Sequence, residues 1–181
     1  MIFHPASLPG AAVIEPEPVE DERGLFARVW SQREFASRGL GATWVQSAVS
    51  YNAKAGTLRG IHYQAAPHAE AKLVRCTRGA IYDVIVDIRP MSAGFLQWAA
   101  FDLTADNRRL LYVPEGFAHG FQTIVDGTEV FYEISAVHHP EAARGLRWDD
   151  PRLGIAWPIV PPRVMSPRDR RFPDLEPHDL A

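Results

Sequence analysis

Eight short segments with strand character follow one another between residues 44 and 137, and this succession constrains the fold more than any other feature. They cover residues 44–52, 57–64, 72–76, 80–88, 95–103, 109–113, 120–125 and 129–137. Residues 80–88 and 129–135 alternate between apolar and polar side chains, as half-buried strands do. Asp126-Gly127 has the composition of a hairpin turn. Short strands and turns at this spacing predict an all-β, antiparallel sandwich or barrel.

The segments on either side of the strands have a different character. Ser31 followed by Glu34 has the pattern of a capping box, which predicts a short helix that ends at Gly39. From Trp157 onward the chain is rich in proline and arginine, so we expect an irregular segment on the surface. A length of 181 residues suits one domain with a sizeable core.

The composition argues against several classes of protein. The net charge of −3 and the absence of a long basic stretch argue against a nucleic-acid binder. No apolar run approaches the roughly 18 residues that a membrane span needs, and the N-terminus lacks a secretory pattern. Cys76 is the single cysteine, so neither an intrachain disulfide nor a cysteine zinc cluster can form. We therefore expect a cytoplasmic protein.

Three polar residues fall on strand faces that could point into a barrel. Strand alternation places Lys72 beside Val74 and Cys76, Tyr132 between Val130 and Ile134, and His62 beside Leu58 and Gln64. A lone inward histidine or tyrosine is usually a satisfied core residue. Lys72 is one of only two lysines among 19 basic residues. A buried lysine is rare without a partner, and the alternative is that its ammonium group reaches solvent at the strand edge.

Residues 114–119 read Pro-Glu-Gly-Phe-Ala-His, and this element resembles the second motif of the cupin jelly rolls. In metal cupins its histidine is a ligand, together with an H-x-H pair and a glutamate on an earlier strand. Here the second position of that pair is Gln64, although His68 and Glu70 lie nearby in a proline-containing loop. A metal-dependent cupin enzyme built on His62, Glu70 and His119 is therefore one alternative.

Seven stretches, in the expected order, are similar to those of the dTDP-4-dehydrorhamnose 3,5-epimerases, and the resemblance extends over residues from about 12 to 175. These are Asp21–Phe26, 58–64 (LRGIHYQ), 71–75 (AKLVR), 82–89 (YDVIVDIR), 112–121 (YVPEGFAHGF), 147–158 (RWDDPRLGIAWP) and 166–169 (SPRD). The resemblance implies an antiparallel jelly-roll (cupin-like) barrel with a few short helices. It would form a single domain over residues 1–181, with an N-terminal arm (1–25) and an irregular C-terminal segment (157–181).

The resemblance also implies a reaction, epimerisation at C3 and/or C5 of a nucleotide-linked 4-keto-6-deoxyhexose. By this resemblance His62 is the base, because a neutral imidazole can abstract a proton near pH 7. Asp169 would orient His62, and Lys72 would stabilise the enolate oxygen. Tyr132 would return a proton from the opposite face. The reaction requires no metal or redox cofactor.

Substrate-binding residues follow from the same resemblance. Arg23 and Arg59 would hold the diphosphate, for which an arginine fork is well shaped, and Phe26 would stack near the base. Further contacts would come from Gln46, His119, His138 and Arg168. The family forms homodimers in which the N-terminal region reaches the partner's site, so we expect a homodimer.

One feature of this assignment conflicts with regular strand geometry. Arg59 and His62 point to opposite faces of a regular strand. Both can serve one site only if the strand bends at Gly60, where a glycine permits it. The alternative is that Arg59 serves a neighbouring subunit.

Four positions depart from the family pattern. His138 stands where the family usually has a tyrosine, Glu133 where it commonly has a lysine, and Ser47 and Ala48 where it favours an acidic residue and asparagine. These positions leave open the nucleotide, the sugar and whether one or both carbons are inverted. Another alternative is a sugar-nucleotide-binding protein without catalytic activity.

Overall fold

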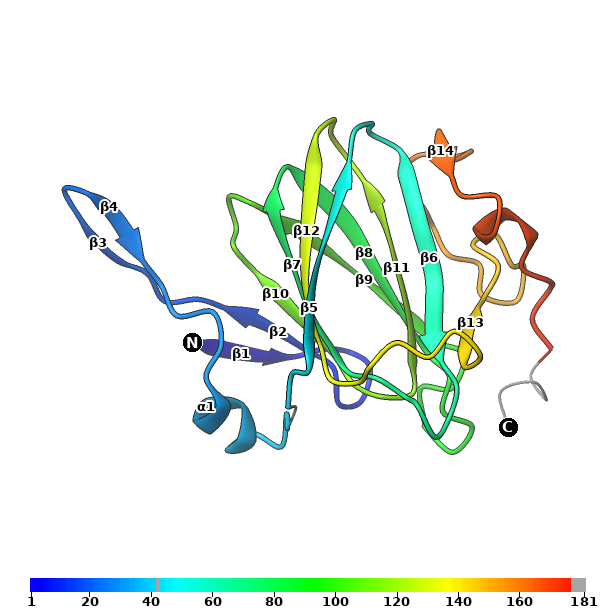
Figure 1. Ribbon diagram of the computed structural model, residues 1–181, viewed down its shortest axis with the longest axis horizontal. Coiled ribbons are helices and arrows are strands. Elements are labelled where there is room, and N and C mark those ends of the chain that lie inside the picture. The colour runs from blue at the N-terminus through cyan, green and yellow to red at the C-terminus, as the bar shows by residue number, and fades with distance from the viewer. Residues whose placement is uncertain (42, 177–181) are drawn as a thin grey trace.

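The structure, a computed structural model, describes residues 1–41 and 43–176. Two antiparallel sheets face each other in a jelly-roll sandwich (Figure 1). The strand order in the first sheet is β1 (Ile2–Pro5), β2 (Ala12–Glu15), β10 (Leu110–Val113), β7 (Lys72–Arg78), β12 (Thr128–Ile134) and β5 (Gln46–Asn52). The second has the order β13 (Ala143–Gly145), β6 (Thr57–Gln64), β11 (Phe117–Thr123), β8 (Ala80–Asp87) and β9 (Trp98–Thr104). The prediction of an all-β jelly roll is confirmed.

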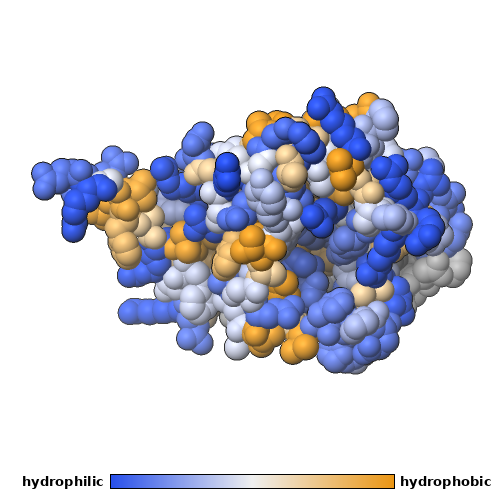
Figure 2. Space-filling model, turned by 45° about the horizontal axis from the view of Figure 1, so that its top comes forward, coloured by the Kyte–Doolittle hydropathy of each residue, from blue (hydrophilic) through white to orange (hydrophobic). Residues whose placement is uncertain are grey.

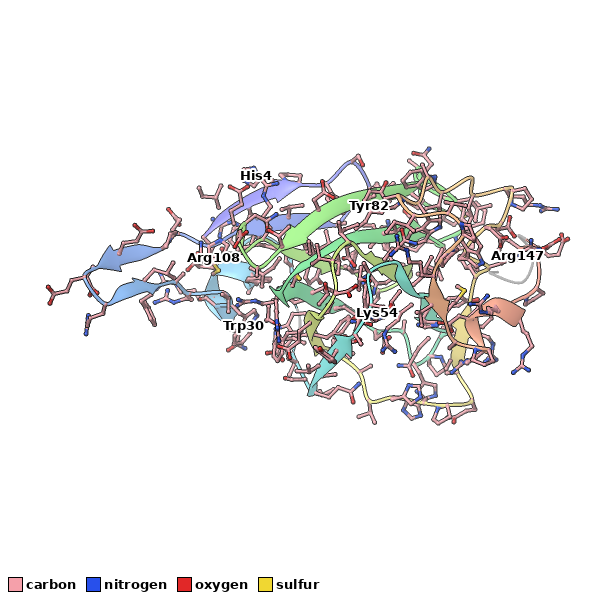
Figure 3. All side chains as sticks on the ribbon, turned by 90° about the horizontal axis from the view of Figure 1, so that it is seen from above. His4, Trp30, Lys54, Tyr82, Arg108 and Arg147 are labelled. Carbon is pink, nitrogen blue, oxygen red and sulfur yellow. The ribbon has the colours of Figure 1, made fainter. Side chains whose placement is uncertain are left out.

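The remaining elements lie outside these two layers. The hairpin of β3 (Val19–Asp21) and β4 (Gly24–Phe26) extends away from the barrel, as Figures 1 and 3 show from two directions. Helix α1 (Gln32–Ala36) begins after Ser31, whose hydroxyl accepts the Glu34 N–H as the capping pattern predicts. The C-terminal segment contributes β14 (Val164–Met165), parallel to β6, and the 3₁₀ helix η1 (Asp169–Arg171). Among the described residues, no helix is long and apolar enough to cross a membrane.

Three apolar clusters hold the layers together. The main core lies between the two sheets and includes Val74, Val130 and Phe121. Trp157 and its neighbours from the C-terminal segment cover the outer face of the second sheet, and Phe35 of α1 covers part of the first. Each fully buried large side chain stabilises the fold by roughly 1.5–3 kcal/mol.

A β-bulge in β6 sets the direction of the side chains that follow it. His62 pairs with His119 and Arg59 with Phe121, so three steps along β6 oppose two along β11. Arg59 and His62 therefore face the same cavity. Leu58, which regular alternation places with His62, instead joins the core on the other face.

Gly60 permits this bulge because it needs no space for a side chain. Its φ is +125°, and an added Cβ would lie 2.5 Å from the Cα of Gly120 on the neighbouring strand. Two glycines therefore let β6 and β11 approach closely at the point where the strand changes direction.

We expect Gly60→Ala to lower the free energy of unfolding by about 2–5 kcal/mol, because it combines a strained φ with a clash against backbone. Urea unfolding measures this loss. Gly24→Ala is the matched control, because Gly24 has φ +121° but no atom within 4 Å of an added Cβ. If both substitutions have the same effect, the close approach of β6 and β11 does not require glycine.

Candidate active site

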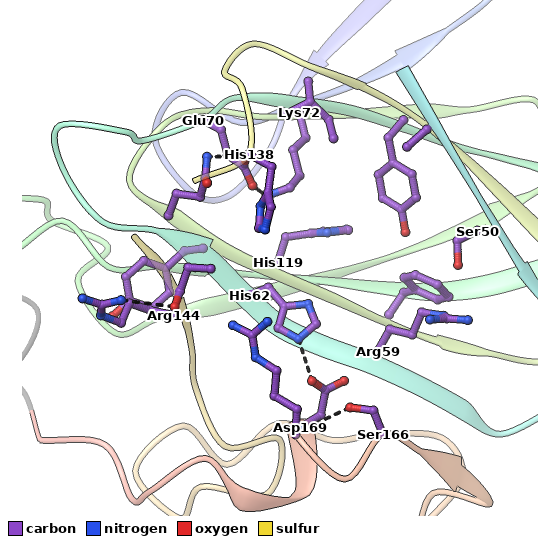
Figure 4. A pocket seen from close by; sticks show the side chains of 18 residues that line it. Ser50, Arg59, His62, Glu70, Lys72, His119, His138, Arg144, Ser166 and Asp169 are labelled. Atoms are coloured by element: carbon purple, nitrogen blue, oxygen red, sulfur yellow. Dashed lines mark hydrogen bonds and ion pairs between the residues drawn. The ribbon is translucent and has the colours of Figure 1, made fainter. Parts of the chain in front are cut away.

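A cavity of about 430 Å³ opens between the two sheets. Its walls come from β5, β6, β7, β11, β12, β13 and the segment that leads into η1. His62, Lys72, Tyr132 and Asp169 all line this cavity, and Figure 4 shows the first two and Asp169 around it. Four residues from distant parts of the chain thus meet in one place.

His62 and Asp169 form a hydrogen-bonded pair on one wall. The His62 Nε2 atom lies 2.8 Å from Asp169 Oδ1. The Asp169 side chain is only 6% exposed, whereas His62 is 43% exposed toward the cavity. The carboxylate fixes the imidazole orientation, which leaves Nδ1 as the ring nitrogen able to exchange a proton.

The environment of Asp169 favours its charged form. Burial acts to raise the pKa of its carboxyl, but hydrogen bonds from His62 and the Gly60 N–H outweigh it, so the pKa is lowered. The Ser166 hydroxyl accepts the Asp169 backbone N–H at 3.0 Å and helps fix the turn. An ionised Asp169 stabilises a proton taken up by His62.

Lys72 lies at the start of β7, where it is buried and lines the cavity instead of extending into solvent at the strand edge. Its Nζ atom is 2.6 Å from Glu70 Oε1, and the two side chains are 9% and 12% exposed. The Gln64 amide donates a hydrogen bond to the other Glu70 oxygen at 3.0 Å. Glu70 thus holds the ammonium at the cavity wall and compensates its charge.

Tyr132 stands on β12 in the sheet that also carries Lys72. Burial, followed by the nearby Asp83 carboxylate, raises the pKa of Tyr132 well above its ordinary value. Its ring meets the His119 ring edge-on, with 6.1 Å between centroids, and His119 Nε2 lies 2.7 Å from Asp83 Oδ1. The hydroxyl therefore stays protonated and can donate.

The three residues of the metal-cupin alternative do not form a common ligand set. His62 pairs with Asp169, His119 with Asp83 and Glu70 with Lys72. Within the described part of the chain, their ligand atoms do not gather within 4.8 Å of one another. The side chains present favour proton transfer over metal coordination at this position.

The predicted binding residues divide into two groups. Arg59, His119, His138 and Arg168 line the cavity. Gln46 does not line it, but it begins β5 opposite Ile134, which does. Arg23 and Phe26 lie on the projecting β3–β4 hairpin and are absent from the cavity of their own chain. Arg23 pairs there with Asp21.

Sequence reasoning missed two charged groups at this cavity. The sequence indicates Glu70 only as a metal ligand, although its position two residues before Lys72 is compatible with one strand face. Arg144 on β13 also lines the cavity, and its guanidinium donates to the backbone carbonyls of Glu141 and Ala143. No pattern in the sequence pointed to Arg144, because only the pairing of β13 with β6 brings it there.

Comparison with known proteins identifies the family. Residues 5–177 match the family model described as dTDP-4-dehydrorhamnose 3,5-epimerase. The chain belongs to this epimerase family. A dTDP-4-dehydrorhamnose 3,5-epimerase from Sinorhizobium fredii is 41% identical over 175 residues, covering 97% of this chain and 90% of that protein.

Solved structures of epimerases share the fold. The dTDP-4-dehydrorhamnose 3,5-epimerase from Bacillus anthracis, solved with TDP and PPi bound, superposes with a TM-score of 0.93 at 41% identity, covering 96% of this chain and 99% of that one. A 4-keto-6-deoxy sugar epimerase from the novobiocin cluster of Streptomyces spheroides gives a TM-score of 0.90 at 35% identity, covering 95% and 86%.

The Asp169 pair gives the stability of this epimerase a pH dependence. Because the pKa of Asp169 is lower in the folded state, its hydrogen bonds stabilise the fold above the ordinary aspartate pKa of about 4. That stabilisation is lost as the pH falls through the folded-state value. We expect Asp169→Asn to cost about 1–3 kcal/mol at pH 7 and progressively less below pH ~4.

Urea unfolding of both proteins between pH 7 and pH 3 measures the difference. Asp106→Asn, on the surface, controls for the substitution itself. A wild-type advantage that does not shrink in acid would contradict the assignment of an ionised, hydrogen-bonded Asp169.

Proposed function

We propose that this protein epimerises a nucleotide-linked 4-keto-6-deoxyhexose at C3, C5 or both. The observation that carries the proposal is the meeting of a His–Asp pair, a buried lysine and a protonated tyrosine in one cavity. Membership of the epimerase family supports the same reaction.

The reaction begins with removal of a proton beside the C4 ketone. His62 accepts the proton from C3 or C5, and the electron pair moves onto the C4 oxygen to give an enolate. The ammonium of Lys72 stabilises the negative charge that develops on that oxygen. Tyr132 donates a proton to the same carbon from the opposite face, which inverts it, and solvent exchange resets both residues.

Two walls of the cavity supply these opposite faces. His62 stands on β6 of the second sheet, whereas Lys72 and Tyr132 stand on β7 and β12 of the first. A sugar ring between the sheets therefore meets the base on one side and the acid on the other. Glu70 holds the Lys72 ammonium in place before substrate arrives.

Two arginines of the cavity can bind the diphosphate, because the described structure shows no carboxylate partner for either of them. Arg59 bonds only neutral groups in the described structure, Asn52 Oδ1 at 2.7 Å and the Tyr51 carbonyl, and Arg168 also lines the cavity. Their positive charge remains available for phosphate oxygens. TDP is bound in the B. anthracis enzyme, which supports a thymidine diphosphate sugar as the substrate.

The four departures from the family pattern fall in two places. Ser47 and Glu133 face each other across β5 and β12, where the Ser47 hydroxyl donates to the Glu133 carboxylate at 2.6 Å. His138 and Ala48 line the cavity. Differences in the accepted sugar or in the inverted carbon would therefore arise from His138 and Ala48.

We also propose that two copies form a dimer and share their sites. The outer face of edge strand β5 exposes Val49 and Tyr51, which are 59% and 55% exposed. On the hairpin, Val19 and Phe26 are 71% and 75% exposed, and Figure 2 shows apolar side chains gathered there. Apolar surface of this kind fits a second copy of the chain. The hairpin would then bring Arg23 and Phe26 to the partner's cavity.

Solvent isotope exchange tests the reaction. With dTDP-4-keto-6-deoxyglucose in D₂O, we expect wild-type enzyme to place deuterium at C3, C5 or both, detected by NMR. Loss of the base in His62→Ala should slow exchange at least ~10²-fold, while dTDP still raises the melting temperature. His4→Ala, at an exposed position of edge strand β1, serves as the matched control.

Two results would contradict the proposal. The first is exchange by His62→Ala at the wild-type rate. The second is binding of dTDP by the wild-type protein without any exchange on a panel of dTDP-, UDP-, CDP- and GDP-linked 4-keto-6-deoxysugars, which would favour a binding protein.

Mixed dimers test the shared site. Arg23→Ala removes the proposed diphosphate contact from the hairpin, and His62→Ala removes the proposed base from the cavity. Each homodimer should therefore have low activity. If the hairpin serves the partner's cavity, a dimer of the two variants contains one complete site, and co-expressed, purified heterodimer should be far more active than either variant. A heterodimer no more active than the sum of its parents would show that each hairpin serves its own chain.

A further inference from the structure

His68, His139 and Glu141 form a cluster that the epimerase reaction does not use. Each residue offers one ligand atom, and the three atoms lie within 4.8 Å of one another. The two imidazole rings are stacked with 3.7 Å between centroids. None of the three residues lines the catalytic cavity, but two of their chain neighbours, Glu70 and His138, do. We propose that this cluster is a zinc site at the rim of the cavity.

Gln64 fixes the two loops that carry these ligands. Its buried side chain donates to the carbonyls of His68 at 3.0 Å and Val137 at 3.2 Å, and it accepts the His139 N–H at 2.6 Å. One amide group therefore joins the backbones of the two loops next to the histidines. The ligands converge from supports that are already held together, as a preorganised site requires.

The distances suit a small divalent ion. His139 Nδ1 lies 3.1 Å from Glu141 Oε1, close to the ~3.3 Å that separates two ligands of a tetrahedral zinc at bond lengths of 2.0–2.1 Å. The remaining ligand atom is within 4.8 Å, and rotation of the His68 side chain out of its stack on His139 would turn a ring nitrogen toward the ion. Two imidazoles and a carboxylate are ligands that zinc prefers, and the exposed side leaves room for water.

Glu141 is exposed, so it reaches the site without a cost of burial. A bound ion would link the loop before Lys72 to the loop that carries His138, on two sides of the cavity mouth.

Calorimetric titration of the chelator-treated, full-length protein with Zn²⁺ tests the proposal without any substrate. We expect one zinc per chain, with affinity at least ~10-fold weaker in His68→Ala, in His139→Ala and in Glu141→Gln. Glu141→Gln changes an exposed side chain, so it keeps the test meaningful if a histidine variant folds poorly. Zinc should raise the melting temperature of the wild type more than that of these variants.

Two controls separate this cluster from the other histidines. His4 lies on β1 and pairs with Glu15, away from the cluster, so His4→Ala should bind zinc as tightly as wild type. His62→Ala should do the same, because His62 belongs to the catalytic cavity. Wild-type affinity in all three cluster variants, or loss of binding in either control, would overturn the proposal. Because no turnover is measured, the outcome is independent of the epimerase assignment.

Discussion

The bulge at Gly60 determines which side chains of β6 face the cavity. In a regular strand, Arg59 and His62 would point to opposite sides, and the proposed base would be separated from the arginine proposed to bind phosphate. The extra residue on β6 turns both toward the space between the sheets. It also places the Gly60 N–H 3.4 Å from Asp169 Oδ2. The backbone that reorients the strand thus also helps to keep the partner of His62 ionised.

In the proposed reaction, the two sheets divide the chemistry between them. The second sheet supplies His62, with Asp169 behind it in the C-terminal segment, and the first supplies Lys72 and Tyr132. The pKa values of Tyr132 and Asp169 respond differently to burial. Tyr132 keeps its proton because its charged form would be desolvated next to Asp83, whereas Asp169 loses its proton because hydrogen bonds outweigh desolvation. At neutral pH the cavity therefore contains both a tyrosine hydroxyl that can donate a proton and an ionised carboxylate that can stabilise protonated His62.

Much of this arrangement could be predicted from the sequence, because it follows from local patterns. Alternation and turns predicted the strands, Ser31 predicted the start of the helix, and motif resemblance pointed to His62 and Lys72. The bulge could not be predicted, since a glycine permits a bend without specifying one. Nor could the Lys72–Glu70 pair or the approach of Arg144, which depend on packing and on strand pairing far along the chain. Arg23 and Phe26 lie on the β3–β4 hairpin, away from the cavity of their own chain, and motif resemblance alone could not predict that position.

The central claim is that base and acid act from opposite faces, and Tyr132→Phe tests it most directly. This substitution removes the acid and leaves the His62–Asp169 pair in place. Deuterium exchange and inversion of configuration are measured on the same substrate in D₂O. We predict that the variant still exchanges the proton beside the ketone, because His62 can return solvent deuterium from its own face, while inversion falls at least ~10²-fold. Inversion at the wild-type rate would contradict the account.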